Sequence, residues 1–203
     1  WMLFGAEFWE RFCYYGMRAL LAVYVAAQFF AHLPAGEAKA QASLTYGGYT
    51  SLVYATGILG GMIADRYLGY QRSIILGGLL MAVGCFMLLS PEIHLFLIGL
   101  AVIVAGNGLF KPNISTMVGK LYAPGDVRRD SGFTIFYMGI NAGAFVAPLI
   151  TAVWIGANYG YKYGFLAAAI GMIFGIAVFQ VRKGMLGHVG KSPAGREGWG
   201  PVL

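Results

Sequence analysis

The sequence is poor in charged residues. Lysine and arginine number 14 and aspartate and glutamate 8, which together make 11% of the 203 residues, whereas a soluble domain contains roughly 25%. Apolar residues make up 59% of the chain. This balance excludes an ordinary soluble domain and indicates an integral membrane protein. The apolar segments show no two-residue alternation and run past the ~10 residues of a barrel strand, so we expect helices.

Cysteine and histidine are also scarce, with two and three residues. Cys13 and Cys85 each fall within an apolar segment, so we expect packing thiols and no disulfide. Glu7 and Glu10 could act as a carboxylate pair in a membrane enzyme, but no histidine-rich metal set, phosphate loop or nucleophile accompanies them. The sequence therefore predicts no catalytic residues, no metal site and no cofactor, and it disfavours a membrane enzyme.

Six segments are long and apolar enough to cross ~30 Å of hydrocarbon. The fold class we predict is therefore an all-α membrane protein with six transmembrane helices in residues 1–184. Residues 32–43 between the first two segments are polar and are expected to form an external loop. Residues 185–203 are rich in Gly, Pro and Ser, which is typical of a linker. The six segments are approximately 3–31, 45–64, 73–90, 93–119, 131–155 and 162–181.

The basic residues are distributed unevenly along these segments. Lys39 and Lys162 fall on one side of the predicted membrane, and nine basic residues fall on the other. The positive-inside rule then places both ends of the chain in the cytoplasm. The net charge of +6 reflects this topology, so we expect no nucleic acid partner. The nine are Arg66, Arg72, Lys120, Arg128, Arg129, Arg182, Lys183, Lys191 and Arg196.

A polar stripe runs along the first apolar segment. Its residues follow spacings of 0, 3, 4, 7, 8 and 11, and at about 100° per residue they cover roughly 140° of a helix surface. Each ionisable group costs ~2.5–3.5 kcal/mol to insert into a bilayer, so four on one face imply partners and a lined cavity. We expect a substrate and ion pathway rather than an amphipathic surface helix. The stripe consists of Glu7, Glu10, Arg11, Tyr14, Tyr15 and Arg18.

Polar residues also interrupt two later segments. Lys111, beside Pro112 in the fourth segment, lies about eight residues from the basic loop at Lys120, which is too far for its side chain to reach the interface. In the fifth segment, Asn141 offers a hydrogen-bonding amide. Both positions predict a functional role. Three Gly-x-x-x-Gly spacings predict close helix packing; they begin at Gly57, Gly139 and Gly171.

The loop after the second segment reads GMIADRYLGYQR and resembles a motif of major facilitator superfamily transporters. In this interpretation Gly61, Asp65, Arg66 and Gly69 form a cytoplasmic gate, because the glycines permit tight contact and the charges can bridge neighbouring helix ends. The motif indicates the superfamily and not the substrate.

Three further stretches resemble the proton-coupled oligopeptide transporter family of that superfamily. The resemblance implies twelve or more helices in two six-helix halves, and this chain matches the amino-terminal half. The expected partners are di- and tripeptides, protons, the lipid bilayer and a carboxy-terminal six-helix half. The expected location is the plasma membrane, or the inner membrane of a bacterium. The stretches are EFWERFCYYG from Glu7, FKPNIS from Phe110 and FYMGINAGA from Phe136.

By this resemblance two sets of residues carry the function. The substrate set binds the carboxylate and peptide groups that all short peptides share, and the coupling set handles the proton. Gly47 stands where animal members have a functional histidine, so proton handling would rest on the glutamates. The substrate set is Arg11, Arg18, Tyr14, Tyr15, Tyr54, Lys111 and Asn141, and the coupling set is Glu7, Glu10, Arg11 and Lys111.

Two other functions remain open at this point. Some plant relatives import nitrate or another small anion, although two glutamates beside Arg11 favour peptide and proton symport. The chain could also be a non-transporting helical assembly partner.

Overall fold

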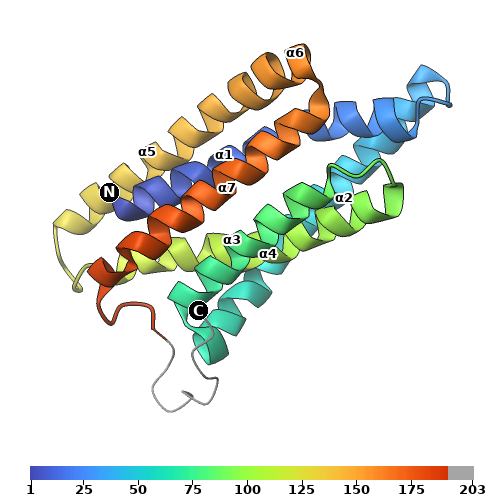
Figure 1. The fold of residues 1–203 in the computed structure, drawn as a ribbon. Helices are drawn as coiled ribbons and strands as arrows, with labels where there is room; N and C mark the ends of the chain where they lie inside the picture. Colours follow the sequence, from blue (N-terminus) through green and yellow to red (C-terminus); the bar gives the residue numbers. More distant parts are fainter. Residues whose placement is uncertain (192–203) are drawn as a thin grey trace.

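The computed structural model describes residues 1–191, and all regular structure in that range is helical. The six predicted spans are confirmed as six helical rods (Figure 1). Their helices are α1 (Met2–Phe29), α2 (Ala35–Ile63), α3 (Tyr70–Met87), α4 (Ile93–Lys120), α5 (Arg128–Pro148) and α7 (Tyr161–Arg182).

Shorter helical elements extend three of these rods. The π-helical η1 (Ala64–Leu68) follows α2, and the 3-10 element η3 (Lys183–Leu186) follows α7. The fifth rod continues from α5 through the π-helical η2 (Leu149–Gly156) into α6 (Ala157–Tyr159). The chain turns sharply after η1 and after α6 at Gly69 and Gly160, whose φ angles of 75° and 107° suit glycine.

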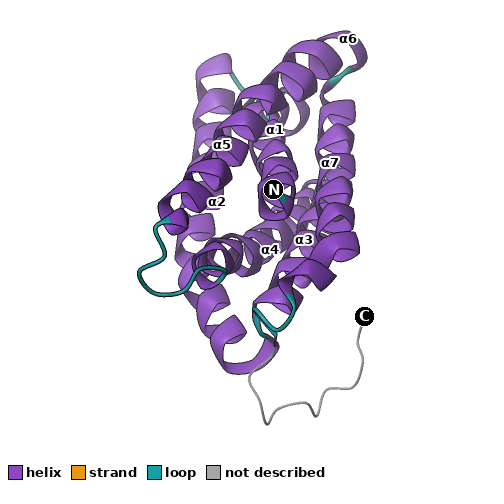
Figure 2. Ribbon diagram, turned by 90° about the vertical axis from the view of Figure 1, so that its left-hand side faces the viewer, coloured by secondary structure: helices purple, strands orange, loops and turns teal. Residues whose placement is uncertain are grey.

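Helix α1 lies in the interior of the bundle. It packs against α5 and α7 on its two flanks, and Figure 2 shows its start enclosed by the other helices. Helix α3 packs on α4 and α7, and α4 packs on α2. Because α1 is surrounded by protein, its charged stripe is shielded from lipid over most of its length.

Glycines allow this close packing, as two of the three predicted spacings indicated. A Cβ at Gly139 or Gly143 of α5 would meet the backbone of α1, and one at Gly175 of α7 would lie 2.9 Å from the Cβ of Trp9. The third spacing is wrong. A Cβ at Gly57 or at its partner Gly61 would meet no neighbouring element within 4 Å among residues 1–191.

The contact glycine of α2 is instead Gly60. A Cβ there would overlap the Gly108 carbonyl of α4. The spacing rule finds glycines on one helix face, but it cannot say which face meets the neighbour. Rotation of α2 by one residue, about 100°, therefore separates the predicted contact from the observed one.

Four rods have the length and composition of a membrane span: α3, α4, Arg128–Tyr159 and Tyr161–Leu186. The other two, α1 and α2, are 28 and 29 residues long, so each reaches about 40 Å at 1.5 Å per residue. Charged residues lower the hydropathy of α1, and glycine, tyrosine and threonine lower that of α2. Both pack alongside the others and complete a six-helix membrane bundle.

The loop predicted for residues 32–43 is wrong over most of its length. Helix α2 already begins at Ala35, so only residues 30–34 join it to α1. The segment Glu37–Ala42 contains glutamate, lysine, glutamine and three alanines, all good helix formers. Its polarity predicts that it leaves the hydrocarbon, but a polar segment can remain helical.

The linker expected from residue 185 differs from the structure at its start. Leu186 is buried, and Gln71 of α3 fixes the residues that follow. The Gln71 backbone amide donates to the Gly190 carbonyl at 2.9 Å, and its Nε2 donates to the Val189 carbonyl at 2.7 Å. Packing therefore continues to Gly190. The rest of the predicted linker, residues 192–203, lies outside the described residues.

The two ends of the described chain meet on one side of the bundle. Met2 of α1 and Leu186 of η3 line the same cavity of about 190 Å³. An even number of crossings requires this arrangement. Figure 1 shows the N-terminus beside the end of α7.

Candidate functional site

A buried ion cluster forms the centre of the site. Glu7, Glu10 and Arg11 of α1 are 1%, 0% and 2% exposed. The Arg11 guanidinium binds Glu10 through Nε and, at 2.6 Å, through Nη2, and its Nε lies 3.2 Å from Oε1 of Glu7. One guanidinium thus faces two carboxylates. With both ionised, the cluster carries one net negative charge away from water.

The two carboxylates differ in their remaining partners. Asn107 of α4, 1% exposed, donates from Nδ2 to Oε1 of Glu10 at 3.0 Å. Both oxygens of Glu10 are therefore engaged. By contrast, Oε2 of Glu7 is buried and has no hydrogen-bond partner among residues 1–191. An unpaired buried anionic oxygen is costly, so Glu7 is the carboxylate of this cluster best suited to accept a proton.

Aromatic rings surround the cations of α1. The Arg11 guanidinium lies 5.2 Å from the Tyr14 ring and 5.9 Å from the Tyr15 ring. Arg18, about two turns further along α1, lies 5.1 Å from the ring of Tyr46 in α2, and its Nε donates to the Tyr46 hydroxyl. These contacts are within the range of cation–π attraction.

Tyr46 was not predicted as a site residue. The sequence did contain a signal for it, because Tyr46, Thr50 and Tyr54 recur every four residues and so share one face of α2. Tyr54 was selected and Tyr46 was not.

Lys111, a member of the expected coupling set, does not contact the two glutamates of that set. Its side chain is exposed, and Nζ lies 5.4 Å from the ring centroid of Tyr54. Within the described part of the chain no carboxylate lies within 4 Å of it. Arg11 shares a helix with both glutamates and already engages them, which leaves Lys111 to face outward from α4.

The remaining predicted substrate residues lie on open surface. Tyr54 is 65% exposed, and Asn141 of α5 is exposed as well. Gly143, two residues later, packs against Arg11, and residues two apart point to opposite sides of a helix, so Asn141 faces away from that contact. The two described cavities both lie elsewhere. Lys111 and Tyr54 are thus neighbours on exposed surface, and the described residues do not enclose a pocket around them or around Asn141.

The gate motif forms a local turn. Asp65 accepts a hydrogen bond from the Tyr70 hydroxyl at 2.5 Å, and Nζ of Lys120 lies 4.4 Å from the Tyr70 ring. Gly69 supplies the positive φ of the turn. Arg66 lies within η1, and Gly61 has open space around it. The motif thus ties the end of α2 to α3 and α4 at one end of the bundle.

Comparison with known proteins gives a consistent result. The model of the POT family matches residues 71–194. A di-/tripeptide transporter of Lactococcus lactis is 47% identical over 197 residues, covering 95% of this chain and 39% of that protein. The peptide transporter YePEPT of Yersinia enterocolitica is 44% identical, covering 88% of this chain and 35% of that protein.

Solved structures show the same similarity. A peptide transporter POT in complex with alafosfalin has a TM-score of 0.84 and 46% identity, over 94% of this chain and 39% of that one. A POT family transporter in complex with 5-aminolevulinic acid has a TM-score of 0.85 and 39% identity, over 95% and 39%. The chain spans about two fifths of the length of these relatives.

Proposed function

The chain belongs to the POT family, and we propose that it forms the amino-terminal six-helix half of a proton-coupled symporter for di- and tripeptides. The observation that carries this proposal is the buried Glu7–Arg11–Glu10 cluster, accompanied by two cations that are not buried, Arg18 and Lys111. We propose that the exposed polar groups around these cations form one wall of the peptide site. A second six-helix half would supply the opposite wall. The relatives named as di-/tripeptide transporters support the choice of substrate.

The wall suits the groups that all short peptides share. Arg18 and Lys111 can hold a carboxylate, Arg18 with a planar fork and Lys111 as a point charge. Tyr15, Tyr54 and the Asn141 amide can bond to peptide N–H and C=O groups. Because none of these contacts depends on a peptide side chain, the site tolerates varied sequences.

Proton coupling is assigned to the buried cluster. A proton on the unpaired Glu7 oxygen would remove the excess negative charge and weaken the hold of Glu7 on Arg11. Arg11 would then be held by Glu10 alone, which Asn107 fixes in place. The two charge states would favour different positions of the two halves, and alternating access would follow from that difference. Protons are the coupling ion, and we propose no cofactor.

The proposed setting is a cell membrane, with both ends of this chain in the cytoplasm. The uneven distribution of basic residues supports that orientation. In this proposal the peptide crosses the membrane chemically unchanged, and the protein does not act as an enzyme on it.

Uptake into liposomes containing the complete protein tests the proposal. A labelled dipeptide should accumulate when the outside is acidic and should only equilibrate without a proton gradient. Labelled nitrate should not accumulate under either condition. Gradient-driven uptake of nitrate, but not of the dipeptide, would show that the substrate is a small anion and not a peptide. No uptake of either, with correctly folded protein, would favour an assembly role.

A further inference from the structure

Asn107 of α4 reaches the ion cluster of α1 from another helix. Its Nδ2 donates to Oε1 of Glu10 at 3.0 Å, across 97 positions of sequence, and the two side chains are 1% and 0% exposed. Among residues 1–191, no other side chain from outside α1 bonds to either glutamate of the cluster. This bond therefore joins the charged part of α1 to α4.

The glycines on either side of Asn107 fix the direction of its side chain. A Cβ at Gly106 would lie 2.6 Å from the Gly77 carbonyl oxygen of α3. A Cβ at Gly108 would lie 2.9 Å from the Cβ of Thr56 in α2. Successive residues of a helix point about 100° apart, so α3 and α2 flank the asparagine and its side chain points between them, toward α1. Because both contacts are tight, α4 cannot rotate about its axis and take the amide away from the cluster.

The hydrogen-bond donors are divided unequally between the two glutamates. Glu10 accepts from Nε and Nη2 of Arg11 and from the Asn107 amide. Glu7 lies 3.2 Å from Nε of Arg11, and its Oε2 has no partner in residues 1–191. A donor stabilises the ionised form of the carboxylate that accepts its bond. The amide of α4 thus favours an ionised Glu10.

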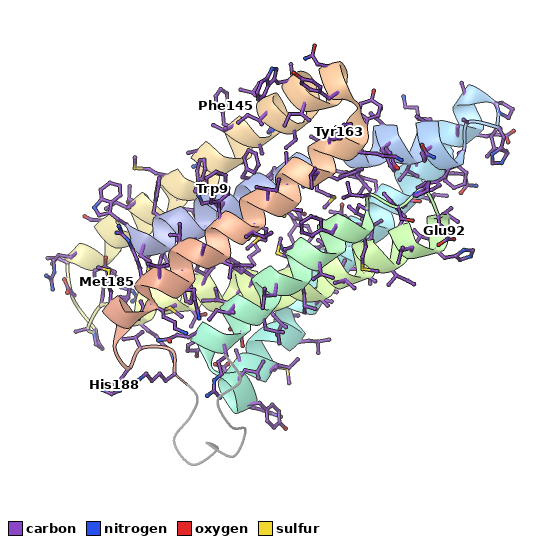
Figure 3. The ribbon with its side chains drawn as sticks, viewed as in Figure 1. Trp9, Glu92, Phe145, Tyr163, Met185 and His188 are labelled. Atoms are coloured by element: carbon purple, nitrogen blue, oxygen red, sulfur yellow. The ribbon has the colours of Figure 1, made fainter. Side chains whose placement is uncertain are left out.

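No helix packed beside Glu10 offers a second donor of this kind. Trp9, the residue before Glu10 and labelled in Figure 3, stacks on Phe174 of α7 at 5.4 Å, and α5 meets this part of α1 with Gly143. Tyr49 of α2 interacts electrostatically with Glu10, but its hydroxyl has no hydrogen-bond partner among the described residues.

The remaining titratable groups nearby have other contacts. The Cys13 thiol lies 3.6 Å from the Cys85 thiol of α3. Nζ of Lys111 lies over the Tyr54 ring, 5.4 Å from its centroid. Neither the thiols nor the ammonium group bonds to the glutamates within the described part of the chain. Asn107 is therefore not duplicated by a neighbour.

We propose that Asn107 is a positioning residue of the coupling mechanism: it holds Glu10 ionised on Arg11 and so sets the pH at which the cluster accepts a proton. This inference rests on the proposed proton symport and adds to it a residue outside the α1 stripe. Asn107 touches neither the peptide nor the proton in this role. It acts through Glu10, whose charge it stabilises.

Infrared titration of the complete protein tests this role without requiring transport. A protonated carboxyl group has a C=O band of its own, and the band that is absent in Glu7→Gln belongs to the cluster. Asn107→Leu removes the amide at similar volume. Asn113→Leu is the matched control, because Asn113 is a second asparagine of α4 at 1% exposure and its Nδ2 donates only to backbone carbonyls.

Asn107→Leu should raise the midpoint pH of this band by about one to two pH units, the equivalent of one hydrogen bond to a charged group. The pH profile of dipeptide uptake should move in the same direction. Asn113→Leu should leave the midpoint unchanged, even where it lowers the melting temperature. If Asn107→Leu does not fold, Asn107→Asp keeps the shape and adds a second carboxyl group beside Glu10, which should also raise the midpoint.

An unchanged midpoint in the Asn107 variant, or an equal shift in Asn113→Leu, would show that Asn107 only packs α4 against α1 and would overturn the inference. Failure of the proposed symport has a different result. In that case the unaltered protein would not accumulate dipeptide in a proton gradient, whatever the midpoint of the band.

Discussion

Arg18 of α1 donates a hydrogen bond from Nε to the hydroxyl of Tyr46 in α2, with its guanidinium 5.1 Å from the same ring. The bond uses one edge of the guanidinium and leaves the terminal nitrogens available to another group. Arg18 is therefore oriented before any ligand arrives. Such preorganisation reduces the entropy lost on binding.

Replacing Arg18 should weaken binding of peptides that have a free carboxylate. Arg18→Ala should raise the Kd by roughly ten- to a hundredfold, the equivalent of ~1.5–3 kcal/mol for one charge-assisted hydrogen bond. Arg18→Lys should be milder, and Tyr46→Phe milder still, because the ring contact remains. Competition binding to the complete protein measures these values. A peptide amide is the control ligand, and equal losses for both ligands would remove Arg18 from the carboxylate site.

The two glutamates of the cluster should respond differently to neutralisation. Glu7→Gln mimics the protonated state, so gradient-driven accumulation should be lost while exchange of peptide between equal pools continues. Glu10→Gln should lose accumulation as well. It should also lower the thermal stability more than Glu7→Gln, because Glu10 bonds to both Arg11 and Asn107. Uptake and unfolding of the complete protein in proteoliposomes and detergent provide the measurements.

Glu37→Gln is the control for both variants, since Glu37 is an exposed carboxylate near the start of α2. It should leave accumulation unchanged. If Glu7→Gln still concentrates peptide at the unaltered rate, Glu7 is a structural ion-pair partner and the proton site lies outside this cluster.

Packing of α2 on α4 should depend on one glycine. Gly60→Ala places a methyl group against the Gly108 carbonyl, and overpacking of this kind costs about 1–3 kcal/mol. Gly57→Ala adds the same methyl where no atom lies within 4 Å, so it should be neutral within this bundle. Thermal unfolding in detergent compares the two variants. A larger loss for Gly57→Ala would contradict the observed rotation of α2.

The start of α4 should make stability depend on pH. Glu92 accepts from the amides of His94 at 2.8 Å and Leu95 at 2.6 Å. These bonds favour the charged carboxylate and lower the pKa of Glu92 from its ordinary value of 4.5. Because the folded pKa is the lower one, the stabilisation is fully present above 4.5 and is lost as the pH falls toward the folded pKa.

Glu92→Gln should therefore flatten part of the fall in melting temperature below about pH 4.5. The melting temperatures of both proteins are measured across this range. Parallel curves for the two proteins would show that Glu92 contributes nothing to the pH dependence.

Features that depend on local sequence were predictable here. The six rods follow from long apolar segments, because burying backbone polar groups in lipid demands helices. The stripe from Glu7 to Arg18 follows from the helical repeat alone, as does the shared face of Gly139 and Gly143. The resemblance of three short motifs to the oligopeptide transporter family was confirmed by the comparison with known proteins.

Contacts between helices could be identified only from the tertiary structure, because they depend on how each helix is rotated about its own axis relative to its neighbours. The use of Gly60 instead of Gly57, the bond from Asn107 to Glu10, and the position of Lys111 over Tyr54 all follow from that rotation. No local pattern encodes it. Likewise, composition described Val189 and Gly190 as linker residues, whereas Gln71, 118 positions before Val189, holds them against α3. The pairing of Arg11 with Glu7 and Glu10 is local to α1. Side chains distant in sequence meet only when the whole bundle is packed, and that packing placed Asn107 beside Glu10, Tyr46 beside Arg18 and Tyr54 beside Lys111.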